Sequence, residues 1–113
     1  MKLTEIVGQL SLDLFTPISD PGAAVTGGYS GDLLSHVLSS ALPGNLWITI
    51  QHHANVVAVA QVTGLSAVLI VDGKRPNDGV REQARSSGVT LLGSTESAFE
   101  VAGRVRELLA AQR

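Results

Sequence analysis

Residues 46–71 read LWITIQHHANVVAVAQVTGLSAVLIV, and this stretch decides the fold. The runs 46–50 and 67–71 are short and almost wholly apolar, which is typical of strands buried on both faces of a parallel sheet. Residues 56–60 lie between them and are compatible with a strand or a buried helix, because periodicity alone does not separate the two. Two parallel strands need a crossover of about a dozen residues. Residues 53–64 supply that length, so we expect a helix between two parallel strands.

The segment before this stretch continues the alternation of helix and strand. Apolar residues recur at helical spacing over residues 3–10, and residues 12–15 alternate with period two, so a short helix and a short strand are expected there. Residues 23–28 predict a strand that ends in glycines. Ser30 is a good N-cap for a following helix, which stops where Pro43 is followed by glycine.

The segment after it has the same organisation. Asn77 is expected to cap a helix that Gly88 ends, and residues 89–92 predict a brief strand. Ser94 or Thr95 then caps a last helix with a regular apolar stripe. We therefore predict an α/β fold with a mainly parallel β-sheet, helices on both faces and right-handed crossovers.

The length predicts one domain over residues 1–113, because 113 residues fit a single hydrophobic core. Residues 1–22 form its N-terminal helix, short strand and loop, and residues 23–113 form the α/β core. The chain has a formal net charge of −2 and no basic stretch, which argues against nucleic-acid binding. It has no cysteine, which excludes disulfides and thiolate metal sites. Neither a signal peptide nor a membrane span is expected, so the predicted location is cytoplasmic.

Ligands of open parallel sheets bind beyond the carboxyl ends of the strands, where helix N-termini also point. Four loops are expected at that edge, at residues 26–32, 51–55, 72–77 and 93–95. Their candidate ligand-binding residues are Thr26, Gly27, Gly28, Tyr29, Ser30, Asp32, Gln51, His53, Asn55, Lys74, Arg75 and Thr95.

Each candidate also has an interpretation without a ligand. Gly27 and Gly28 either admit a ligand close to the backbone or only make a tight turn. His53 and Asn55 either contact a ligand or cap a helix, and Lys74 with Arg75 either neutralises a phosphate or forms a solvated turn.

Other pairings are expected to be structural. Asp32 with His36, and Glu100 with Arg104, have the spacing of surface pairs on a helix. Trp47 and Phe99 are interpreted as core or dimer contacts rather than stacking platforms for bases.

No catalytic or metal-binding residue is assigned. The stretch Gly28 to Gly31 is near the nucleophile-elbow pattern, but its second glycine comes one residue early and no partner residues follow. His52 and His53 are adjacent, which is awkward for joint metal ligation. There is no P-loop, and no cofactor is identified.

Several blocks in order carry a resemblance to a known family. They are VTGGY at 25–29, DLLS at 32–35, WITIQ at 47–51, HANVVAVA at 53–60 and SAFEVAG at 97–103. In these blocks the chain resembles the small stand-alone DRTGG-domain proteins. That resemblance implies a fold similar to the N-terminal domain of bacterial HPr kinase/phosphorylase, a homodimer, and a relation to proteins that also carry CBS or acyltransferase domains. Only Thr26, Gly27 and Gly28 of the family signature are present, so no role of its arginine is carried over.

The sequence thus favours a non-enzymatic regulatory or sensing module. It would bind a small ligand, nucleotide-like or phosphorylated, at the strand-end loops, as a homodimer. The alternatives are a structural adaptor that docks a partner protein through residues 56–62 and the stripe ending at Leu108 and Leu109, and a phosphate-handling enzyme that uses His53 and Asp32.

Overall fold

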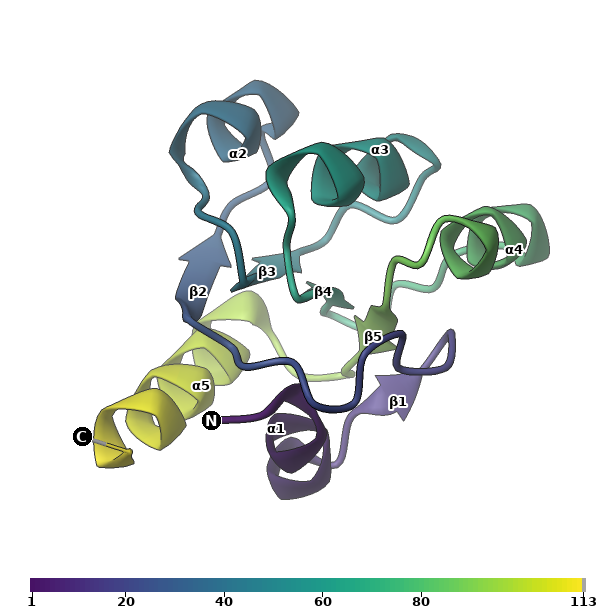
Figure 1. Cartoon of the computed structure of the whole chain (residues 1–113). Coiled ribbons are helices and arrows are strands. Elements are labelled where there is room, and N and C mark those ends of the chain that lie inside the picture. Colours follow the sequence, from purple (N-terminus) through teal and green to yellow (C-terminus); the bar gives the residue numbers. More distant parts are fainter. Residues whose placement is uncertain (113) are drawn as a thin grey trace.

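In the computed structural model, which describes residues 1–112, five strands form one sheet in the order β1-β5-β4-β3-β2 (Figure 1). The strands are β1 (Asp13–Leu14), β2 (Gly27–Ser30), β3 (Asn45–Thr49), β4 (Ala67–Ile70) and β5 (Leu91–Gly93). β2, β3, β4 and β5 are parallel, and β1 pairs antiparallel with β5. The predicted mainly parallel sheet is confirmed.

Helices cover both faces of the sheet, as expected. Helices α1 (Leu3–Leu10) and α5 (Ala98–Ala111) lie on one face, and α2 (Leu34–Ser40), α3 (Asn55–Thr63) and α4 (Asp78–Ser86) lie on the other (Figure 1). Residues 53–64 therefore contain the predicted crossover helix between β3 and β4. Among the described residues no helix combines the length and apolarity that crossing a bilayer requires.

The sheet divides the core into two layers, because successive strand side chains point to opposite faces. Leu46 and Ile48 of β3 pack with α1 and α5, whereas Trp47 packs with α2 and α3. Trp47 is completely buried, and its indole N–H donates to the carbonyl of Gly31 at 2.8 Å. The tryptophan is thus a core residue with its one polar atom satisfied.

Two helix starts show how well capping can be predicted. The side chain of Asn77 accepts a hydrogen bond from the backbone N–H of Val80, as expected for the cap of α4. Helix α5 is capped by Ser97, which accepts from the N–H of Glu100, and not by Ser94 or Thr95. Arg104 pairs with Glu96 in the loop before the helix, and not with Glu100 as expected.

The segment around β2 differs most from the sequence prediction. The strand begins at Gly27 instead of ending at the glycines, and Ser30 lies inside it rather than capping a helix. Helix α2 starts at Leu34, and its N-cap residue, Leu33, makes no side-chain cap hydrogen bond. The physical reason is the in-register pairing of all four β2 residues with β3, which outweighs the low strand propensity of glycine.

This shift moves Thr26 to the amino-terminal edge of the sheet. Its hydroxyl donates to the carbonyl of Pro43 at 2.9 Å and accepts from the side-chain amide of Asn45 at 3.2 Å. Gly44 has a φ of +82°, and a Cβ there would lie 2.6 Å from the Thr26 side chain. Thr26 and Gly44 thus join the strand starts of β2 and β3 on the side opposite to the predicted ligand edge.

Candidate functional site

Asp32 and Gln51 form a hydrogen-bonded corner where β2 and β3 end. One carboxylate oxygen of Asp32 accepts from the hydroxyl of Thr49 at 2.8 Å and from the N–H of Ile50 at 3.0 Å. The amide of Gln51 donates to the carbonyl of Asp32 at 2.9 Å. The Asp32 carboxylate therefore holds two loops together, and the expected ion pair with His36 is not formed in the described chain.

His52, His53 and Asn55 follow this corner. The two histidine rings lie 4.4 Å apart between centroids, and Nδ1 of His52 lies 3.1 Å from the carbonyl of Ile50. His53 and Asn55 are exposed. The N-cap of α3 is Ala54, which makes no side-chain cap hydrogen bond, so Asn55 does not have the capping role weighed for it. Residues 1–112 contain no group of three or more His, Asp or Glu that could hold a metal ion.

The loops after β4 and β5 are tied to each other by their backbones. The N–H of Asp72 donates to the carbonyl of Glu96 at 2.8 Å, and the N–H of Gly73 donates to the carbonyl of Ser94 at 3.0 Å. Asp72 and Gly73 both have positive φ, at +63° and +72°, which makes a tight left-handed turn. Thr95 lies exposed on the second loop. This turn fixes the backbone from which Lys74 and Arg75 extend.

Two arginines gather on the ring of Phe15, from segments far apart in the sequence. The guanidinium carbon of Arg75 lies 4.9 Å from the ring centroid, and that of Arg81 lies 5.6 Å from it. Nε of Arg81 donates to the carbonyl of Phe15 at 3.0 Å. We call Phe15, Lys74, Arg75 and Arg81 the Phe15 basic cluster. Lys74, Arg75 and Arg81 make no ion pair within the described chain, although Asp72 and Asp78 are near in sequence.

The Phe15 ring is held in place by the end of β5. It is 6 % exposed, and a Cβ built on Gly93 would lie 2.3 Å from its Cζ. Only a residue without a side chain lets the ring lie against β5 at this point. Sequence reasoning missed Phe15 and Arg81 because the contact joins residues 66 positions apart. The one sequence signal for Arg81 is its position in the first turn of α4. Because helical side chains extend toward the N-terminus of their helix, the Arg81 side chain is directed toward the loop that carries Lys74 and Arg75.

A hollowed surface lies elsewhere, between β2 and α5. Three adjoining depressions of about 530, 250 and 370 Å³ run along the two elements. We call them the β2–α5 groove. Its lining includes five predicted ligand residues, Thr26, Gly27, Gly28, Tyr29 and Ser30, together with Ala102, Arg106 and Leu109.

The structure therefore separates the predicted ligand residues into groups. Residues 26–30 lie along the β2–α5 groove, whereas Asp32, Gln51, His53 and Asn55 lie at the β2–β3 corner. Lys74 and Arg75 belong to the Phe15 basic cluster. The glycine-rich segment starts β2, which pairs with β3 at one side of the sheet, whereas the basic pair follows β4, so the two do not lie in one loop cluster.

Comparison with known proteins defines the class of fold. The chain matches a crystal structure of the CBS and DRTGG domains of the regulatory region of Clostridium perfringens pyrophosphatase, complexed with the activator diadenosine tetraphosphate. The TM-score is 0.69 at 18 % identity, over 92 % of this chain and 45 % of the other. No family model matches the chain, and no curated protein matches it. The fold is thus DRTGG-like, and the chain spans less than half of the matched regulatory region.

Proposed function

We propose that this protein is a non-enzymatic regulatory or sensing module, acting as a homodimer, that binds a small phosphorylated ligand of nucleotide type. The observation that carries the proposal is the Phe15 basic cluster. Its three cations have no acidic partner among the described residues, and Lys74 and Arg75 follow β4 at the carboxyl edge of the sheet. Ligands of parallel α/β sheets bind at this edge.

The geometry of the cluster suits a phosphate. Guanidinium groups present donors in a planar fork that matches phosphate oxygens. Both arginine side chains are already held against the Phe15 ring, so each loses less conformational entropy when a ligand binds. The Nε atom of Arg81 is occupied by the Phe15 carbonyl, so its terminal nitrogens remain for a ligand. The N-terminus of α4 follows directly and adds a partial positive charge, which Asp78 in its first turn partly offsets.

The matched structure supports a regulatory role. That pyrophosphatase carries a DRTGG domain in its regulatory region, and the region is complexed with a nucleotide activator that has four phosphates. A DRTGG-like fold thus occurs in a protein part that responds to a phosphate-rich nucleotide. We extend this to the present chain as a proposal about the class of ligand.

The adaptor alternative loses most of the surface that suggested it, although Val62 at the end of α3 is 78 % exposed. Val56, Val57, Val59 and Ala60 of α3 are buried in the core of the chain itself, so this helix does not offer them to a partner. Leu108 and Leu109 are partly buried against the other core layer.

The test is a binding measurement on the whole chain with inorganic triphosphate, diadenosine tetraphosphate and adenosine. We expect both phosphate compounds to raise the melting temperature and adenosine to leave it unchanged. A ligand at a hundred times its Kd adds about 2.7 kcal/mol of stability. Arg75→Gln should weaken triphosphate binding about ten-fold or more, because hydrogen bonds to charged groups contribute about 1.5–3 kcal/mol.

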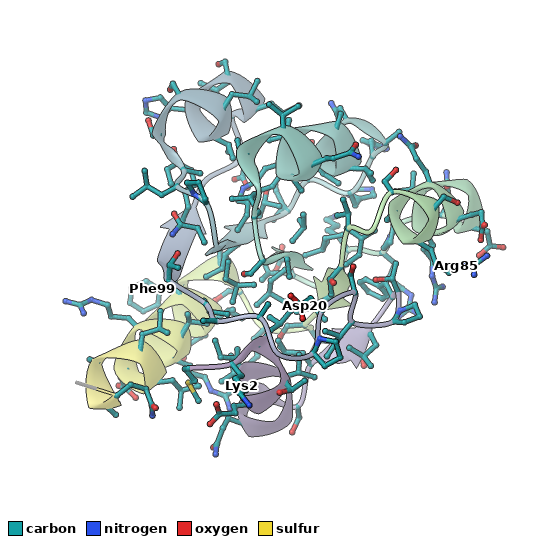
Figure 2. The ribbon with its side chains drawn as sticks, viewed as in Figure 1. Lys2, Asp20, Arg85 and Phe99 are labelled. Atoms are coloured by element: carbon teal, nitrogen blue, oxygen red, sulfur yellow. The ribbon has the colours of Figure 1, made fainter. Side chains whose placement is uncertain are left out.

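Arg85→Gln is the matched control. Arg85 is an exposed arginine on the same helix as Arg81, but it is paired with Glu82 at 2.8 Å (Figure 2). Its loss should leave triphosphate binding unchanged. Equal weakening by Arg75→Gln and Arg85→Gln would show only nonspecific attraction, and no binding of either phosphate compound would overturn the proposal.

A further inference from the structure

Strand β2 leaves one side of the sheet open. It pairs with β3 alone among the described strands, and the N–H of Gly31 donates to the carbonyl of Ile48 at 3.1 Å. Residues two positions apart in a strand direct their N–H and C=O groups to the same side, and adjacent residues direct them to opposite sides. Since Gly31 directs its N–H to β3, the N–H and C=O groups of Ser30 and Gly28 point away from β3. Native edge strands are commonly protected by lysine, proline or a bulge. The sequence of β2, GGYS, contains no lysine or proline.

Helix α5 presents an exposed patch beside this edge. Gly103 is exposed, and a Cβ built there would meet no atom within 4 Å. Phe99, Glu100, Arg106 and Glu107 lie three or four positions from Gly103, so they surround it on the same helix face. Phe99 is 84 % exposed and is the most exposed large apolar side chain in the described chain (Figure 2).

Glu100 and Arg106 carry charges of opposite sign on the two sides of Gly103, and Glu107 adds a second negative charge next to Arg106. Glu100 lies one turn before Gly103 and Arg106 lies one turn after it. Arg106 lies beside Gly28 in the groove, whereas Glu100 lies beside Ser30 near the other end of β2. A two-fold axis at Gly103 exchanges positions 100 and 106, and it also exchanges 99 and 107. Two antiparallel copies of α5 would therefore place each Glu100 opposite the other copy's Arg106.

We propose that the β2 edge and the α5 patch bind a second copy of this chain, with β2 antiparallel to β2 and α5 antiparallel to α5. The same axis passes near Gly28 and Tyr29, the middle of β2, so strand pairing and helix pairing share one symmetry. An interface of this kind uses the same surface on both copies, which is the usual geometry of a homodimer. The glycine at the axis lets the helices approach closely, and Phe99 of each copy packs on the aliphatic part of the other copy's Glu107.

This interface specifies the homodimer part of the proposed function and does not depend on the ligand. The Phe15 basic cluster follows β1 and β4, whereas the interface uses β2 at the opposite edge of the sheet. Ligand binding and dimerisation can therefore be tested separately on the same protein.

The experiment is sedimentation velocity on the whole chain over a range of concentrations. Ser30→Pro removes an N–H that points away from β3 and should raise the dimer Kd about ten-fold or more, because each dimer loses two backbone hydrogen bonds. Ser30→Ala keeps that N–H and is the matched control, with an expected Kd close to wild type. Circular dichroism verifies that both variants fold.

Charge exchange provides a second measurement that does not touch the strand. Arg106→Glu should weaken the dimer, and Arg106→Glu combined with Glu100→Arg should restore it, because the symmetric pairing is then rebuilt with the signs reversed. If the double variant does not regain the wild-type dimer Kd, or if Ser30→Pro leaves the Kd unchanged, this interface is overturned, and the chain dimerises through another surface. A wild-type chain that stays monomeric would overturn the homodimer itself. Loss of triphosphate binding alone would count only against the ligand proposal.

Discussion

The contact between Gly93 and Phe15 gives the sharpest prediction about stability. A methyl group at position 93 would lie 2.3 and 2.4 Å from two ring carbons of Phe15, well inside any van der Waals contact. The ring is buried and carries the contacts with Arg75 and Arg81, so it cannot move without disturbing both. Overpacking of this kind costs about 1–3 kcal/mol, and we expect Gly93→Ala to lower the free energy of unfolding by that amount.

Urea denaturation followed by the fluorescence of Trp47, the single tryptophan, measures this change. Gly8→Ala is the control, because a Cβ at Gly8 in α1 meets nothing within 4 Å and should stabilise the helix by up to about 1 kcal/mol. Phe15→Leu removes the ring, so its cost should be smaller in the Gly93→Ala background, with a coupling of about 1 kcal/mol or more. Equal costs of Phe15→Leu in both backgrounds, or wild-type stability of Gly93→Ala, would refute the tight contact.

Three further predictions concern the loops and α4. Asp32→Ala should lower the free energy of unfolding by about 1–3 kcal/mol, because it leaves the buried hydroxyl of Thr49 without its acceptor, and urea denaturation with Asp32→Asn as the milder variant measures this. Asn77→Ala should cost about 1 kcal/mol through loss of the α4 cap, and Asn77→Ser should recover most of it in the same assay. The hydrogen bond from Arg85, together with its charge, lowers the pKa of Glu82, so Arg85→Gln should raise that pKa in an NMR titration. The stabilising effect of this pair is present above the unfolded-state pKa of the carboxyl and is lost as the pH falls through its folded value, although both groups are exposed and salt should screen it.

The sequence predicted the fold best where the elements before and after a segment determine whether that segment is a helix or a strand. Residues 46–71 predicted a strand, a helix and a parallel strand, because the crossover length decides between the alternatives for residues 56–60. The cap at Asn77 was predicted correctly because a capping hydrogen bond joins residues only three positions apart. The homodimer and the ligand stay predictions.

The sequence was least informative where a long-range contact decides. The glycines at 27 and 28 looked like the end of a strand, but their pairing with Asn45 and Leu46 makes them its beginning. The candidate site changed accordingly. Arg75 was identified from a basic pair, whereas its companions Phe15 and Arg81 come together only through the pairing of β1 with β5.

The two edges of the sheet are unequal, and this limits how far copies of the chain can assemble. At the far edge β1 has only two residues and runs antiparallel, so it offers little backbone for another strand to continue the sheet. In the proposed dimer, growth by strand addition would therefore stop after one round at β2. If two copies pair through β2 as proposed, only the two short β1 strands are left at the outer edges, and such a closed pair offers no long strand for a fibre to extend.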